Sequence, residues 1–122
     1  MATRTDKITD ILRTVRASTP EVIGACVVNR EGFIVASHIP TEVDEDVVGG
    51  MAASILAVGE RIAQDMMNAQ MEQVHVRSGK GHIIVTAIDE EYAIVLLVTR
   101  DAKLGMIFLE LKKMAAELAK QV

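Results

Sequence analysis

The fold is decided by residues 44–67, which read DEDVVGGMAASILAVGERIAQDMM. Apolar residues recur there every three or four positions, a spacing that predicts a long amphipathic helix. Asp44 and the two acidic residues after it lie at the expected N-terminus, where the helix dipole favours negative charge. The apolar arc is roughly 200° wide, whereas a helix that covers one sheet needs about 100°. This helix therefore has two apolar faces to bury.

The two faces differ in the size of their side chains. We expect the bulky face to pack on the chain's own sheet. Its members are Val47, Met51, Ile55, Val58, Ile62 and Met66. We expect the other face to contact the same helix of a second copy, because small side chains allow close approach and large apolar patches mark interfaces. Its members are Ala52, Leu56, Gly59 and Ala63. The alternative is that a loop or another helix of the same chain covers this second face.

Strand and helix patterns lie on both sides of the long helix. Before it, the pattern predicts a helix capped by Thr5 or Asp6 and then a hairpin, at residues 6–18, 22–28 and 33–37. After it, the pattern predicts three strands and a helix, at residues 71–77, 82–88, 92–99 and 104–121. The order α-β-β-α-β-β-β-α predicts a five-stranded, mostly antiparallel sheet in an α/β fold of the α+β sandwich type. We expect a single domain over residues 1–122.

Composition argues against several classes of partner. The 122 residues carry a net charge of −4 and include only one tyrosine and two phenylalanines. A surface of this charge does not favour nucleic acid or an anionic membrane, and few rings are present to stack on bases. No apolar run approaches the length of a membrane-spanning helix, so we expect no membrane insertion. The one cysteine, Cys26, fits a reducing compartment, and we expect a cytoplasmic location.

Each motif that could carry chemistry has a simpler structural explanation. The turn at residues 79–81 contains a glycine–lysine pair, but it lacks phosphate-loop spacing and precedes a strand. His75 and His82 are expected to lie diagonally on one sheet face as solvated histidines, because two imidazoles without a third ligand make a poor metal site. Cys26 is expected to be a buried, inert thiol. We therefore predict no catalytic residue, no metal and no cofactor, and a protein that is not an enzyme.

Three segments together resemble the Roadblock/dynein light-chain domain family, over about residues 5–121. Residues 27–37 (VVNREGFIVAS) resemble the family's first hairpin, and residues 51–61 (MAASILAVGER) resemble its alanine-rich middle helix. Residues 104–111 (LGMIFLEL) resemble the glycine-containing entry into its last helix. The resemblance implies that the middle helix lies on one face of the sheet and the two terminal helices on the other.

The resemblance also implies a function. Family members dimerise through the middle helix and the neighbouring edge strand, here residues 71–77, and they act as scaffolds and regulators of small Ras-like GTPases. The chain is most similar to the stand-alone prokaryotic kind, which partners a GTPase of gliding motility and can stimulate GTP hydrolysis without donating an arginine. Two alternatives stay open: a signalling or cytoskeletal adaptor with a non-GTPase partner, and a small-ligand-binding domain with a pocket under the middle helix.

These expectations assign residues to two surfaces. The expected dimer interface comprises Ala52, Leu56, Gly59, Ala63, Val74 and Val76. The candidate partner-binding residues are Glu60, Arg61, Gln64, Gln73, His75 and Arg77. Gly59→Leu is expected to weaken the dimer more than the fold of one chain.

Overall fold

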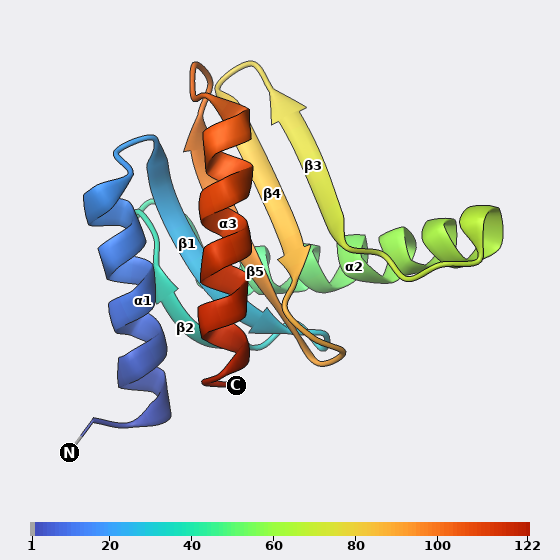
Figure 1. Ribbon diagram of the computed structural model, residues 1–122, viewed down its shortest axis with the longest axis horizontal. Helices are drawn as coiled ribbons and strands as arrows, with labels where there is room; N and C mark the ends of the chain where they lie inside the picture. The colour runs from blue at the N-terminus through green and yellow to red at the C-terminus, as the bar shows by residue number, and fades with distance from the viewer. Residues whose placement is uncertain (1) are drawn as a thin grey trace.

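A computed structural model describes residues 2–122 (Figure 1). Its elements are α1 (Arg4–Ser18), β1 (Val22–Asn29), β2 (Ile34–His38), α2 (Glu45–Met67), β3 (Gln73–Ser78), β4 (Gly81–Ala87), β5 (Tyr92–Thr99) and α3 (Leu104–Ala119). The predicted order α-β-β-α-β-β-β-α is confirmed, and hydrophobic periodicity placed each element within two residues of its observed ends.

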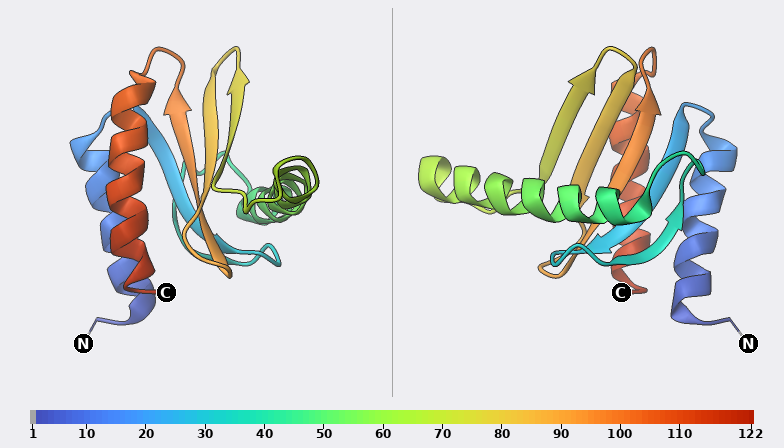
Figure 2. Two further views of the ribbon diagram at one scale, coloured as in Figure 1. Left: turned by 45° about the vertical axis from the view of Figure 1, so that its right-hand side comes forward. Right: turned by 180° about the vertical axis from the view of Figure 1, so that it is seen from behind.

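The five strands form one sheet in the order β2-β1-β5-β4-β3, and every neighbouring pair is antiparallel. The two strands that are apolar on both faces, β1 and β5, lie next to each other inside the sheet, as strands covered on both sides should. Helices α1 and α3 lie on one face and α2 lies on the other (Figure 2). The predicted arrangement of helices about the sheet is therefore confirmed.

Each face of the sheet has its own apolar core. Under α1 and α3 the larger core includes Ile8, Leu12 and Leu111, all of them buried. Under α2 the smaller core includes Cys26 and Leu56. Burial, with a further contribution from the charge of Glu45, raises the pKa of the Cys26 thiol to about 12, so this thiol is buried and protonated as expected.

Side chains that cap the helix starts define two of the three helix N-termini. The cap of α1 is Thr3, not Thr5 or Asp6 as the sequence suggested. Its hydroxyl accepts a hydrogen bond from the Asp6 amide, and the Asp6 carboxylate accepts one from the Thr3 amide, which completes a capping box. Asp44 caps α2 by accepting from the Asp46 amide.

The two faces of α2 are used largely in the reverse of the predicted way, although Ile55 of the bulky face is half-buried against the core under α2. Ala52 and Leu56 pack on the sheet of their own chain and are only 4% and 1% exposed. Gly59 also faces the sheet, because a Cβ built on it would lie 2.5 Å from Sδ of Met71. These residues are therefore not available to a second copy. The small side chains let the helix axis approach the sheet closely, and this close approach turns the bulky face outward.

Candidate protein-interaction surface

The outward face of α2 carries a row of exposed apolar side chains, called here the α2 stripe. Each member is between 50% and 78% exposed. The members are Val47, Met51, Val58, Ile62, Met66 and Met67. A row of large apolar side chains along one helix is far more than the scattered apolar residues of an ordinary surface, and such a patch marks an interaction site.

The second half of α2 extends beyond the sheet. The helix crosses the strands and runs on past β3 at the edge, as Figure 2 shows from behind. Gly59 still lies over Met71 and Val74, but every residue from Asp65 to the end of the helix is exposed. Ile62 and Met66 therefore project from a part of the helix that has no strand of this chain beneath it.

The edge strand β3 adds an unpaired backbone to this surface. One side of β3 pairs with β4, and within the described residues its other side has no neighbour. Val74 is half-buried under α2, and Val76 on the same face is 39% exposed. An open strand edge is a template for pairing with another chain. The α2 stripe and the β3 edge thus form one continuous surface.

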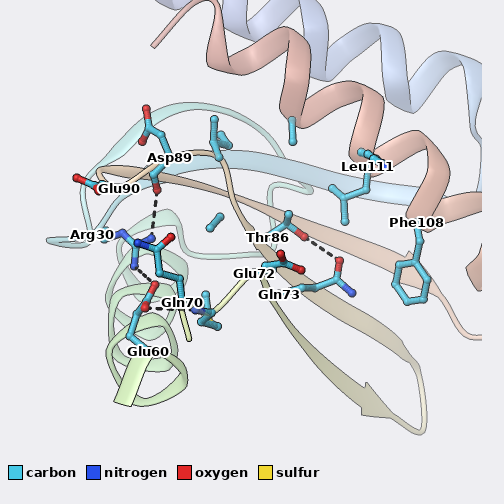
Figure 3. A pocket seen from close by; sticks show the side chains of 15 residues that line it. Arg30, Glu60, Gln70, Glu72, Gln73, Thr86, Asp89, Glu90, Phe108 and Leu111 are labelled. Carbon is cyan, nitrogen blue, oxygen red and sulfur yellow. Dashed lines mark hydrogen bonds and ion pairs between the residues drawn. The ribbon is translucent and has the colours of Figure 1, made fainter. Parts of the chain in front are cut away.

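Glu60 is half-buried and is held by contacts within its own chain. Its carboxylate pairs with a guanidinium nitrogen of Arg30 at 3.0 Å and accepts a hydrogen bond from the Met71 amide at 3.4 Å. Arg30 also donates to the backbone carbonyl of Asp89 at 3.2 Å (Figure 3). This network joins α2 to the turn after β1, the turn after β4 and the segment before β3, so Glu60 positions these segments.

The other two α2 candidates lie on the surface. Arg61 is exposed and makes a long ion pair of 3.8 Å with Asp65, a pair that contributes little in water. Gln64 donates a hydrogen bond to Asn68. Both side chains border the α2 stripe and are free to change partners.

The three β3 candidates lie on the opposite face of the sheet, beside α3. Gln73, His75 and Arg77 are in register with Thr86, Ile84 and His82 of β4. The ring of His75 meets Phe108 of α3 edge-on, with centroids 6.1 Å apart. A partner that contacts both groups of candidates must therefore reach around the β3 edge.

His82 is buried, which corrects the prediction of a solvated histidine. Its Nε2 lies 3.1 Å from the carbonyl of Arg100, which can only accept, so this nitrogen carries the proton. In the neutral ring, Nδ1 of His82 then accepts a hydrogen bond from Nε2–H of His75 at 2.9 Å. The two histidines do share one face, and they satisfy each other by this hydrogen bond. Within residues 2–122, three or more His, Cys, Asp or Glu side chains nowhere gather in a group that could hold a metal ion.

Comparison with known proteins identifies the family. Residues 9–98 match the model of the Roadblock/LC7 domain. The chain belongs to this family. The uncharacterized protein MJ1340 of Methanocaldococcus jannaschii is 30% identical over 102 residues, which cover 82% of this chain and 87% of that protein.

Two solved structures share this fold over almost the whole chain. MglB of Myxococcus xanthus superimposes with a TM-score of 0.90 at 16% identity, over 98% of this chain and 90% of that one. An MglB with a tetrameric arrangement superimposes with a TM-score of 0.87 at 20% identity, over 99% of this chain and 91% of that one. At these identities the likeness shows the fold alone.

Sequence reasoning missed two features of this Roadblock/LC7 chain. The first is Arg30, which lies in a turn and whose partner Glu60 follows 30 residues later, so no local pattern joins them. The second is the outward direction of the bulky face of α2.

No helix among residues 2–122 is long and apolar enough to cross a membrane.

Proposed function

We propose that this chain forms a homodimer through the α2 stripe and the β3 edge, and that the dimer is a non-catalytic platform that binds and regulates a small Ras-like GTPase. The observation that carries the proposal is the apolar half-helix that extends past the sheet edge. Such an overhang exposes Ile62 and Met66 in a single chain, and a second copy at the same edge would cover it.

A two-fold axis beside β3 would bury the α2 stripe and the β3 edge in the same interface. Antiparallel pairing of β3 with its copy would extend the sheet to about ten strands and remove an open edge. The overhang of each α2 would then lie over the partner's sheet near Val76. The proposed interface therefore keeps Val74 and Val76 from the sequence prediction and adds Val58 and Ile62. It leaves out the four predicted α2 residues, which lie on the sheet side of the helix: Ala52, Leu56, Gly59 and Ala63.

The regulatory part of the proposal rests on family membership and on the likeness to MglB. A dimer of this kind places two copies of Arg61 and Gln64 on one broad surface around the paired helices. The effect on GTP hydrolysis would come from ordering the mobile switch segments of the GTPase, without a catalytic group supplied by this chain. We place the complex in the cytoplasm, where the buried free thiol of Cys26 fits the reducing conditions.

The test uses a Ras-like GTPase encoded beside this protein, loaded with a GTP or a GDP analogue. Sedimentation velocity measures the complex, and single-turnover hydrolysis of GTP measures its effect. We expect co-sedimentation with one nucleotide form and a change in the hydrolysis rate. Arg61→Glu should weaken the complex without altering self-association, whereas Arg13→Glu, the same charge change on the exposed surface of α1, should not.

The result that contradicts the GTPase proposal is a dimer that ignores both nucleotide forms. That result would favour an adaptor with a different partner and would leave the dimer proposal standing.

A further inference from the structure

A groove runs from α3 across the ends of β3 and β4 to Arg30 and Glu60 (Figure 3). It is open along its length and has a volume of about 1020 Å³. One wall is α3, through Phe108, Leu111 and Ala115. The floor is formed by Gln73 and Thr86, from β3 and β4. The groove ends at the turn between β4 and β5, near the Arg30–Glu60 pair.

The groove exists because two helices cannot cover five strands. No buried core residue under α1 and α3 comes from β3, so this face of β3 is left open. The side chains there are polar, and Thr86 donates a hydrogen bond to Gln73 across the floor at 3.1 Å. The groove therefore has an apolar wall and a polar floor, and the polar floor can face solvent without further cover from its own chain.

The charge of the groove is acidic. Four acidic residues line it, against two basic residues. The acidic residues are Glu60, Glu72, Asp89 and Glu90. Of the basic residues, Arg30 is already bound to Glu60 and to a backbone carbonyl, which leaves Lys112.

Two of the acidic side chains are free to accept. Asp89 uses one carboxylate oxygen to hold the amides of Glu91 and Tyr92 in the turn. Glu72 and Glu90 make no side-chain hydrogen bond or ion pair with any residue that the structure describes. Among the described residues, the carboxylates of Glu72 and Glu90 therefore have no partner, and both residues line the groove.

We propose that this groove binds a basic polypeptide segment of a partner protein, with an apolar side chain of the segment against Phe108 and Ala115 and its lysines or arginines beside Glu72 and Glu90. Anionic ligands, including nucleic acid, are disfavoured by the net negative charge. The groove lies mainly on the α3 side of the sheet, opposite the α2 stripe, and it borders the β3 edge at residues 70–73.

The test maps binding on the amide NMR spectrum of the full-length, ¹⁵N-labelled chain. The probe is a nine-residue peptide. It has leucine at its central position and lysine at alternating positions on both sides of that leucine. We expect saturable shifts confined to residues 70–73, 86–90 and 108–115. A peptide with glutamate in place of lysine should give no shifts, and a peptide with serine in place of leucine should bind more weakly.

Matched variants separate the groove from general charge attraction. Glu72→Gln with Glu90→Gln should weaken binding of the lysine peptide by about fivefold or more, the sum expected for two exposed charge pairs. Glu21→Gln with Glu42→Gln removes the same charge from exposed sites outside the groove and should change the affinity far less. Lys112→Glu should strengthen binding, whereas Lys113→Glu, its neighbour outside the groove, should have a smaller effect.

Three results would overturn the proposal. The lysine peptide could shift the acidic start of α2 instead of the groove, which would indicate attraction to charge in general. The groove variants could bind as their controls do. Residues 86–90 and 108–115, which the proposed dimer does not use, could shift on raising the protein concentration without peptide, which would make a second copy the occupant of the groove.

Discussion

His38 couples the stability of the chain to pH. A guanidinium nitrogen of Arg16 lies 3.1 Å from its Nδ1, and an N–H there can donate only to an unprotonated ring. Partial burial, and then the charges of Arg16 and Arg13, lower the pKa of His38 below its ordinary 6.5. The imidazole of His38 therefore takes up a proton at a higher pH in the unfolded chain than in the folded chain.

The sign of the pH effect follows from that order. The contribution of His38 to stability is fully present above the unfolded pKa of 6.5, and it is lost as the pH falls through 6.5 toward the lower folded pKa. We predict that His38→Gln reduces the loss of stability between neutral and mildly acidic pH. Urea unfolding at a series of pH values measures the free energy of unfolding of both proteins. The same dependence of this free energy on pH in both proteins would contradict the account of His38.

Gly49 and Gly50 are adjacent in α2 and should respond oppositely to alanine. A Cβ on Gly49 would collide with the backbone carbonyl oxygen of Gly32, whereas a Cβ on Gly50 would meet nothing within 4 Å. We predict that Gly49→Ala lowers the free energy of unfolding by about 2 kcal/mol or more, because the backbone must move. Gly50→Ala should raise it by about 1 kcal/mol through helix propensity. Thermal and urea unfolding of the pair check both signs.

At the scale of elements, the sequence predicted α2 correctly and assigned its faces wrongly. Periodicity locates apolar residues around a helix, and the width of the arc indicated two buried faces. It does not say which face meets the sheet, because that depends on how closely the helix approaches. Contacts between residues distant in sequence decide it here: Gly49 against Gly32, and Gly59 against Met71.

The reversed faces change the expected effect of Gly59→Leu. A leucine at this position would press on Met71 and Val74 of the same chain. We predict a loss of about 1–3 kcal/mol in the free energy of unfolding, the usual cost of overpacking a core. Ala57→Leu, on the exposed side of the same turn, is the control and should have little effect. A Gly59→Leu chain of normal stability that no longer self-associates would instead support the original assignment.

The candidate site was predictable in part for the same reason. Arg61 and Gln64 are exposed as expected, since both lie in the polar sector of the helix. Glu60 lies in that sector too, yet it binds Arg30, which lies 30 residues earlier in the sequence. Only the tertiary structure brings these two side chains together. Strand alternation correctly placed Gln73, His75 and Arg77 on one face of β3. It could not show that this is the face of the sheet on which α3 lies.

At the scale of the whole molecule, the direction of α2 is the decisive feature. The helix crosses the sheet and leaves its C-terminal half beyond β3 (Figure 2), so the chain exposes an apolar surface and an open strand edge on the same side. On the other face, the acidic groove beside α3 provides a second surface. The proposed dimer uses the first surface, and the proposed basic segment uses the second, which borders the first at residues 70–73.

The self-associated platform is the central claim, and sedimentation of the purified chain at micromolar concentration tests it most directly. We predict a dimer, and we predict that Ile62→Glu sediments as a folded monomer because a charge would be buried at the centre of the interface. Gln64→Glu adds the same charge to the exposed border of the same helix and should remain a dimer. A monomeric native chain, or an Ile62→Glu chain that stays dimeric, would contradict the account.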